Sequence, residues 1–306
     1  MHIPPYLIFP AAVAVIQKES MRHAQLIRHD TGDDAVLLLH GLASGPLEMR
    51  TLANSLRRSG FSVEIPRIHG FGFGAGASDF GDWHEQVLIA FDRLKRDHRT
   101  VSVGGLCAGA LLALSLAAQR PREIAGLSLL SSTLFFDGWS MPWYRFLMPL
   151  WFHTPVRHLY EFNEKQPYGI KNPEIRKRVA RAMRRGYSEA GAARISMDHV
   201  YQASRLSHHV MCNLHLVTAP ALVIHAIDDE TASPKNAEFI MQHIGSPTKR
   251  KVLLDNSYHM ITLDNERDTV AEETGKFFRA NIGGLAAGLP GRASADRFAE
   301  SSRRRA

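Results

Sequence analysis

Short apolar runs alternate along the chain with longer segments in which apolar residues recur every three to four positions. The apolar runs have the length of buried strands, and the spacing between them is typical of amphipathic helices. We therefore expect strands over residues 35–40, 61–66, 100–106, 124–131, 221–228 and 250–255, and helices over residues 47–59, 83–97, 108–119, 234–244 and 266–280. Such alternation predicts an α/β fold with a mostly parallel central sheet flanked by helices.

The alternation breaks between residues 133 and 216. Aromatic residues crowd into the first part of this segment, and residues 173–185 place Ile175, Val179 and Met183 at helical spacing with arginines on the other faces. We interpret the segment as a helical lid inserted into the part of the chain that forms the sheet. The basic faces of its helix are either solvated or a docking surface for an acidic partner.

The two ends of the chain differ in composition from its middle. Residues 1–33 begin with an apolar stretch that contains Pro4, Pro5 and Pro10 and is too short to cross a bilayer as a helix. We expect an N-terminal arm packed on the domain, with peripheral membrane association as the alternative. Residues 34–132 and 217–281 should form the core, and residues 282–306, rich in Gly, Ala, Ser and Arg, a disordered tail.

The formal net charge of +7 is spread unevenly over the 306 residues. Residues 133–216 hold twelve Lys or Arg against six Asp or Glu, and residues 282–306 hold five against two, so the rest of the chain is acidic. No nucleic-acid-binding motif accompanies the basic residues, and we expect no nucleic-acid partner and no integral membrane span. The two cysteines form no disulfide framework, which favours a reducing, cytoplasmic location.

The sequence Gly105-Leu-Cys-Ala-Gly109 directly follows a predicted strand and opens a predicted helix. Small residues two positions before and after a nucleophile are a steric requirement of the sharp strand-to-helix turn called a nucleophile elbow. Taken alone, the motif is also compatible with Cys107 as a small buried residue. The remaining sequence favours the catalytic interpretation, because acidic residues and a histidine follow later strands.

Two further predicted strands end in groups suited to proton transfer. The strand at 221–228 runs into Asp228, Asp229 and Glu230, and His259 lies shortly after the strand at 250–255. In open parallel sheets the ligand crevice lies beyond the carboxyl ends of the strands. Cys107, an acidic residue and His259 are therefore expected to converge there, in the chain order nucleophile, acid, histidine.

These motifs resemble those of the α/β-hydrolase superfamily, in particular its bacterial carboxylesterase and monoacylglycerol lipase-like branch. The resemblance runs from about residue 34 to residue 281 and includes Leu39-His40-Gly41, the helix opening Pro46-Leu-Glu-Met49, and the ending Ser257-Tyr-His-Met-Ile-Thr-Leu-Asp264. Chain order and elbow spacing are those of this superfamily. The departure is the nucleophile, since most of this branch has serine where this chain has Cys107.

The resemblance implies a role for each residue of a catalytic triad. Cys107 would be the nucleophile, favoured as a thiolate by the helix N-terminus and by a nearby imidazolium. His259 would act as the base and then as the acid, and Asp229 would hold its tautomer. The resemblance favours Asp229 over the adjacent Asp228, and Asp137 is an outside candidate because some relatives place the acid at that point.

The same resemblance implies an oxyanion hole formed by the backbone N–H groups of Leu42 and Ala108, with Gly105 and Gly109 as the elbow glycines. His40 would brace the loop rather than react. We expect no metal, because the other histidines lack ligand spacing, and no cofactor. The glycines at 70–76 lack the ending of a phosphate loop, and we interpret them as a flexible wall of the active site.

Cysteine in place of serine broadens the expected chemistry. An acyl-cysteine is a thioester, close in energy to an acyl group on coenzyme A or on a carrier protein. We expect an acyl hydrolase of carboxylesterase or thioesterase type acting on a small ester or thioester through acyl-Cys107. An acyltransferase that uses a coenzyme A or acyl-carrier-protein thioester is the alternative, with an acidic carrier docked at the basic lid. An inactive binding protein of the same fold is the second alternative.

Overall fold

The computed structural model describes residues 32–286. At its centre lies a sheet of six strands in the order β10-β9-β4-β3-β1-β2, and every pairing is parallel. The strands are β1 (Asp34–Leu39), β2 (Ser62–Glu64), β3 (Thr100–Leu106), β4 (Ile124–Leu130), β9 (Ala221–Ala226) and β10 (Lys249–Leu254). All six predicted strands are present, and the predicted α/β-hydrolase fold class is confirmed.

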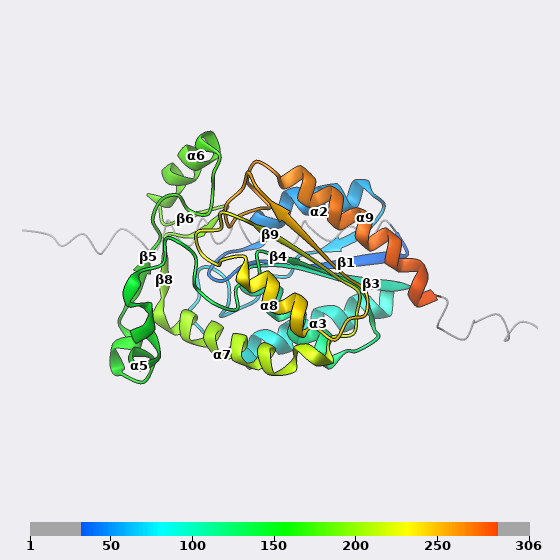
Figure 1. Cartoon of the computed structure of the whole chain (residues 1–306), viewed down its shortest axis with the longest axis horizontal. Helices are drawn as coiled ribbons and strands as arrows, with labels where there is room; N and C mark the ends of the chain where they lie inside the picture. Colours follow the sequence, from blue (N-terminus) through cyan, green and yellow to red (C-terminus); the bar gives the residue numbers. More distant parts are fainter. Residues whose placement is uncertain (1–31, 287–306) are drawn as a thin grey trace, which may run out of the picture.

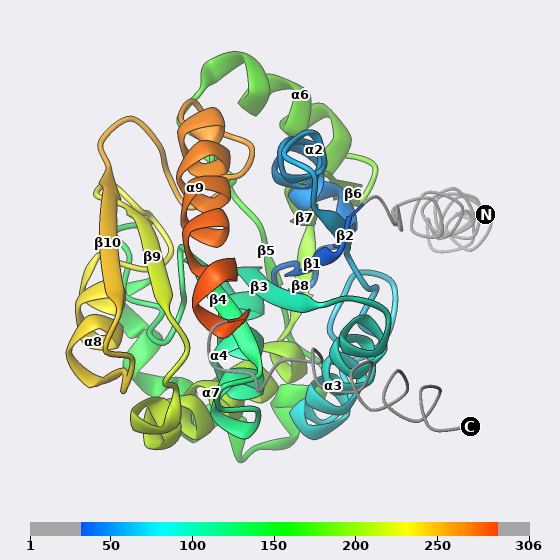
Figure 2. The ribbon, with the colours of Figure 1, turned by 90° about the vertical axis from the view of Figure 1, so that its right-hand side faces the viewer.

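Helices cover both faces of the sheet (Figures 1 and 2). One face carries α2 (Arg50–Arg58) and α9 (Arg267–Ala286), and the other carries α3 (Phe80–Asp97), α4 (Ala108–Gln119) and α8 (Lys235–His243). Side chains of a strand point alternately to the two faces. Accordingly, Val36 and Leu38 of β1 pack in the core on the α2 and α9 side, whereas Leu37 and Leu39 pack on the other side.

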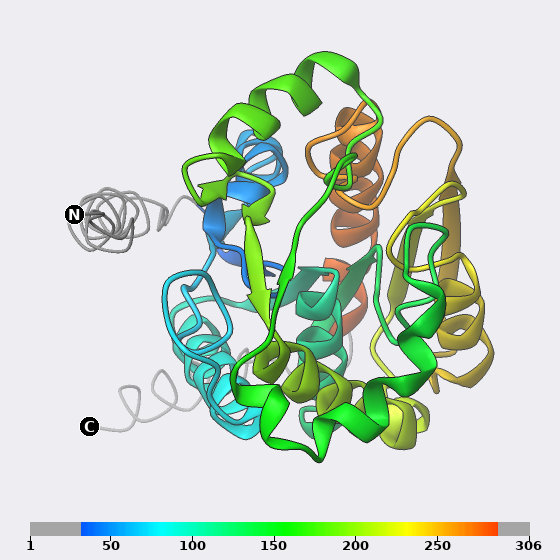
Figure 3. The ribbon, with the colours of Figure 1, turned by 90° about the vertical axis from the view of Figure 1, so that its left-hand side faces the viewer.

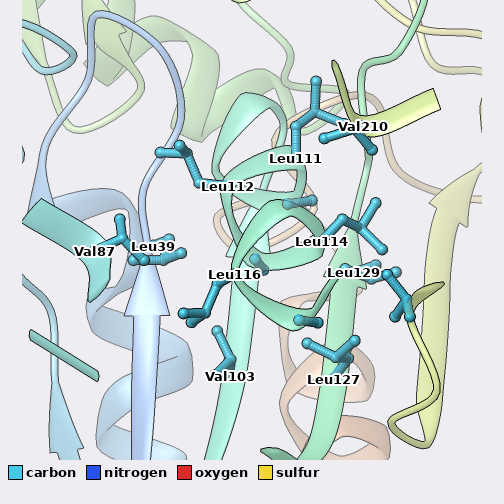
Figure 4. Packing of buried hydrophobic residues seen from close by; sticks show 14 of the residues in the cluster. Leu39, Val87, Val103, Leu111, Leu112, Leu114, Leu116, Leu127, Leu129 and Val210 are labelled. Atoms are coloured by element: carbon cyan, nitrogen blue, oxygen red, sulfur yellow. The ribbon is translucent and has the colours of Figure 1, made fainter. Parts of the chain in front are cut away.

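Helix α4 is the centre of the larger core. All residues from Ala108 to Ala117 are buried, including the leucines on every side of the helix. Figure 4 shows Leu111, Leu112, Leu114 and Leu116 between strand residues such as Val103 and residues of the neighbouring helices. A helix that is apolar all round must lie inside the protein. Ala108, the first residue of α4, is therefore held in a rigidly packed position.

Residues 133–216 depart from the sheet and return to it, forming the end of the molecule that faces the viewer in Figure 3. This segment contains two antiparallel strand pairs as well as helices. Its elements are η2 (Trp143–Leu147), α5 (Met148–Phe152), η3 (Pro155–His158), β5 (Glu161–Asn163), α6 (Pro173–Met183), β6 (Tyr187–Ser188), β7 (Gly191–Ala192), β8 (Arg194–Ser196), α7 (Met197–Asn213) and η4 (Leu214–Leu216).

The structure differs from the predicted elements mainly at their ends. The helix expected over 47–59 is a short 3-10 helix, η1 (Pro46–Met49), followed by α2, and α3 begins at Phe80 after an N-cap from Asp79. Helix α9 continues to Ala286, five residues into the predicted tail. The N-terminal arm up to residue 31 and the tail beyond 286 lie outside the described residues. Among the residues described, no helix is both long and apolar enough to cross a membrane.

Candidate active site

Cys107 occupies the sharp turn between β3 and α4. Its backbone has φ of 57° and ψ of −123°, a conformation that is strained for a residue with a side chain. A Cβ at Gly105 would lie 2.3 Å from the carbonyl oxygen of Gly109, and one at Gly109 would lie 2.3 Å from that of His40. Neither contact is sterically possible. The two glycines are therefore required by backbone atoms, as the elbow motif predicts.

His259 and Asp229 form a buried pair at the carboxyl end of the sheet. The Nδ1 atom of His259 is 2.8 Å from Oδ2 and 3.0 Å from Oδ1 of Asp229. Asp229 is held in turn by the backbone N–H groups of Thr231 and Ala232, which donate to Oδ1 at 2.9 and 2.8 Å. The carboxylate thus defines both the position of the imidazole and which ring nitrogen carries the proton.

The pair has electrostatics suited to a charged imidazole. Burial alone would lower the pKa of His259, but the charges of Asp229 and Cys107 outweigh it and raise the pKa well above its ordinary value. Burial would raise the pKa of Asp229, yet attraction to His259 and hydrogen bonds keep it below the ordinary value. An imidazolium at His259 is therefore stabilised at neutral pH.

Cys107 is close enough to His259 to stabilise its charged form. The Nε2 atom of His259 is buried and has no partner of standard hydrogen-bond geometry among the described residues, yet Cys107 raises the pKa of His259 both by its charge and as a side-chain hydrogen-bond partner. On another side, the hydroxyl of Thr133 lies 3.4 Å from Sγ of Cys107 and is placed to donate to it. The structure thus brings Cys107, His259 and Asp229 together.

The other acids considered from the sequence have other partners. Asp228 is exposed, and its carboxylate pairs with Nζ of Lys171 at 2.9 Å. Asp137 accepts from the backbone N–H of Ser233 at 2.8 Å and from Nδ2 of Asn236 at 2.9 Å. Neither hydrogen-bonds to His259. Of the three acids, Asp229 alone contacts the imidazole.

The loop after β1 brings Leu42 beside the elbow. Within the described residues no acceptor engages the N–H of Leu42, and Ala108, as the first residue of α4, has an N–H without a partner in the helix. His40 is buried with Nδ1 2.9 Å from the carbonyl oxygen of Gly41, and burial lowers its pKa to about 4. A neutral, packed His40 agrees with a bracing role for this residue.

Three further carboxyl groups lie near His259. The sequence places Glu230 after the strand at 221–228, but its motifs assign a role to none of the three. Glu230 accepts the backbone N–H of His259 at 3.1 Å, and burial raises its pKa to about 7. Glu48 is buried, accepts the N–H of Gly41, and has a pKa raised to about 7 by burial. Glu164 is exposed and lies close enough to His259 for their charges to attract.

Residues 171 and 172 are tied to the loop that carries His259. The buried carboxylate of Asp264 accepts the backbone N–H groups of Lys171 at 2.7 Å, Asn172 at 2.8 Å and Tyr258 at 2.9 Å. The ion pair between Lys171 and Asp228 adds a second tie, to the loop that carries Asp229. This part of the 133–216 segment is therefore joined to the site.

The described residues contain no group of three or more His, Cys, Asp or Glu side chains placed to hold a metal ion. The second cysteine, Cys212, is exposed on α7, with Sγ 3.9 Å from Nε2 of His208.

A family model described as "Serine aminopeptidase, S33" matches residues 31–267. The chain belongs to this family. It is 28% identical over 257 residues to the thermostable monoacylglycerol lipase of Bacillus sp. (strain H-257), covering 83% of this chain and 94% of the relative. A carboxylesterase of Bacillus subtilis (strain 168) is 24% identical over 250 residues, covering 80% of this chain and 92% of the relative.

Solved structures agree with the family assignment. The structure reported for the metagenome-derived lipolytic enzymes LipS and LipT superposes with a TM-score of 0.70 and 25% identity, covering 83% of this chain and 96% of that one. The monoacylglycerol lipase of Paleococcus ferrophilus gives a TM-score of 0.64 at 19% identity, with 83% and 94% covered. Together, the family match and these relatives identify this chain as an α/β hydrolase of the monoacylglycerol lipase and carboxylesterase-like branch.

The elbow geometry predicts a sharp difference between two glycine substitutions. Gly109→Ala should destabilise the protein by about 3 kcal/mol, because the new methyl group meets backbone oxygens that cannot move aside. Gly76→Ala is the matched control, since a Cβ there meets nothing within 4 Å. Urea unfolding of both variants measures the difference, and equal midpoints for the two would contradict it.

The Asp229–His259 pair predicts the effect of neutralising each neighbouring acid. Asp229→Asn should lower kcat/KM roughly 10³-fold or more, while Asp228→Asn should stay within about threefold of wild type. Because the negative charge of Asp229 raises the pKa of His259, its loss should also move the alkaline fall of activity to lower pH. Initial rates on a chromogenic ester across pH test both effects; an unmoved alkaline limb in Asp229→Asn argues against the assigned pair.

Proposed function

We propose that the protein is an ester hydrolase that works through an acyl-Cys107 intermediate, with His259 and Asp229 completing a Cys-His-Asp triad. The observation that carries the proposal is a thiol on the elbow turn beside a buried histidine whose other ring nitrogen bonds a carboxylate. The relatives named as monoacylglycerol lipase and carboxylesterase support an ester as the substrate. The family description names serine, so cysteine is the specific feature of this chain.

In the acylation step, the Cys107 thiolate attacks the ester carbonyl carbon and forms a carbon–sulfur bond. The carbonyl oxygen becomes negative and accepts hydrogen bonds from the N–H groups of Leu42 and Ala108. As the intermediate collapses, the imidazolium of His259 donates its Nε2 proton to the departing alcohol. The products of this step are a free alcohol, a neutral His259 and a thioester at Cys107.

Deacylation reverses the proton transfer. Neutral His259 removes a proton from water, whose oxygen attacks the thioester carbonyl, and the same N–H groups hold the negative oxygen. Sulfur then leaves as a thiolate, so the free acid, the thiolate and an imidazolium remain. Thr133 would stabilise the thiolate at the start and end of the cycle through its hydroxyl, 3.4 Å from Sγ. Asp229 stabilises the imidazolium in both steps.

We further propose that residues 133–216 act as a lid over the core formed by residues 34–132 and 217–281. The support is their position at one end of the sheet and their large exposed apolar side chains. Leu159 is 85% exposed and Trp143 78% exposed, and Trp139, Phe146 and Leu150 also face solvent. Such a surface suits an ester with an apolar acyl portion.

An acyltransferase remains the second candidate because a cysteine thioester exchanges readily with other thioesters. The twelve basic residues of the lid support the acyltransferase less strongly than their number suggests. At least six of the twelve form ion pairs within the chain, namely Arg157, Lys171, Lys177, Arg178, Arg194 and Arg205. Less unpaired charge is then left for an acidic acyl carrier protein. The hydrolase is therefore the preferred proposal, and an inactive binding protein is the outcome if Cys107 never reacts.

Intact-mass measurement separates these candidates. After brief incubation with a chromogenic short-chain ester and acid quench, one acyl group should be attached to Cys107, and it should disappear within the time of one turnover in water. Cys107→Ala should show neither adduct nor turnover, while Cys212→Ala, the matched thiol control, should behave as wild type. An adduct that forms only from acyl thioesters and persists in water would favour the transferase, and turnover by Cys107→Ala would exclude both enzyme proposals.

A further inference from the structure

Glu48 is a buried acid that the mechanism above does not use. It lies in η1, immediately after the loop that carries Leu42, and its side chain is 1% exposed. Its Oε1 atom accepts the backbone N–H of Gly41. The N–H groups of Gly41 and Leu42 are consecutive in the chain, so this bond fixes the orientation of the peptide next to the proposed oxyanion hole.

The carboxyl group is also close to the proposed nucleophile. A Cβ added at Gly41 would lie 3.2 Å from Oε1 of Glu48, 3.6 Å from Oε2 and 3.4 Å from Cβ of Cys107. The carboxyl group of Glu48 and the side chain of Cys107 therefore both lie next to Gly41. Inside the protein, a charge on Glu48 interacts with charge on sulfur or on a bound oxyanion with little screening by water.

The titratable groups near Glu48 come from three elements. They are Cys107 on the elbow, at the other side of Gly41, His259 on the loop after β10, and Tyr187 on β6. None of the ion pairs within the described residues includes Glu48. Burial accordingly raises its pKa to about 7, although His259, Ser44 and Gly41 oppose the shift. The group therefore changes charge near neutral pH.

We propose that Glu48 is a positioning residue that also gates the site by its charge: its carboxyl holds the Gly41 peptide, and Cys107 reacts fastest when that carboxyl is neutral. The inference rests on the proposed function. A neutral carboxyl still accepts the Gly41 N–H through its carbonyl oxygen, so the loop keeps its geometry. An ionised carboxyl adds a second buried negative charge, after Asp229, beside the atoms on which the reaction places negative charge.

The test is the pH dependence of single-turnover acylation by a chromogenic ester in the full chain. Wild type should show a downward step of about tenfold centred near neutral pH, before the complete loss at higher pH where His259 loses its proton. Glu48→Gln keeps an acceptor for Gly41 without a titrating charge. It should match wild type within about threefold at pH 6 and exceed it about tenfold at pH 8.5, with no step.

Two further variants separate position from charge. Glu230→Gln is the matched control, because Glu230 is also buried beside His259 with a pKa near 7 but lies against its backbone rather than Gly41. It should keep the step. Glu48→Ala removes the acceptor and should lower kcat roughly tenfold or more at every pH with little change in KM. Recovery by Glu48→Gln at pH 6 then shows that the acceptor matters.

A measurement without ester distinguishes failure of this inference from failure of the proposed function. Alkylation of Cys107 by iodoacetamide, followed by peptide mass to exclude Cys212, should begin at lower pH in Glu48→Gln than in wild type, by up to about one pH unit. If alkylation shifts but no ester acylates Cys107, the gate stands and the substrate is wrong. A step in the acylation rate that is retained in Glu48→Gln overturns the inference. So does a wild type without the step, if wild type and Glu48→Gln are also alkylated over the same pH range.

Discussion

The close approach of Gly109 to the end of β1 is the contact on which the site depends. A Cβ at that position would lie 2.3 Å from the carbonyl oxygen of His40 and 2.4 Å from that of Leu39. Because no side chain intervenes, the first turn of α4 packs directly on the backbone that leads to Leu42. One contact therefore fixes the proposed nucleophile, Cys107, relative to both backbone N–H groups of the proposed oxyanion hole. The fully buried α4 holds this arrangement rigid.

The electrostatic character of the site follows from placing one imidazole among several carboxyl groups. Asp229 is kept ionised by His259 and by backbone donors. For Glu230 and Glu48 the attraction to His259 and the hydrogen bonds are outweighed by burial, which raises the pKa of each to about 7. A thiolate adds negative charge to the same small volume. In this setting cysteine chemistry requires control of the neighbouring acids, a requirement that is weaker for a neutral serine hydroxyl.

Much of the fold could be predicted from sequence because its physical signals are local. Most of the six strands are short apolar runs, and the glycines at 105 and 109 mark the turn from β3 into α4. That His259 would meet an acid from the end of the strand at 221–228 could be expected from chain order and the carboxyl ends of parallel strands, and the family resemblance favoured Asp229. Asp228 and Asp229 are adjacent, and only the folded loop decides that one faces Lys171 and the other the imidazole.

The parts that sequence patterns did not reveal depend on contacts between distant segments. Glu48 stands between Leu47 and Met49 at the start of a predicted helix, a pattern that does not say whether its side chain is buried. Its burial arises because η1 packs against the loop that carries Gly41. The small antiparallel pairs in residues 133–216 involve only two or three residues per strand, too few to produce a periodic pattern. The extension of α9 to Ala286 crosses a change in composition that suggested an end.

The carboxylate of Asp264 has a mechanical consequence. It binds the backbone at residues 171 and 172 and, in the same place, the backbone next to His259. Any displacement of α6 that pulled on residues 171 and 172 would move the imidazole of His259 away from Cys107. An outward swing of α6 to admit a bulky ester would therefore stop the proposed reaction.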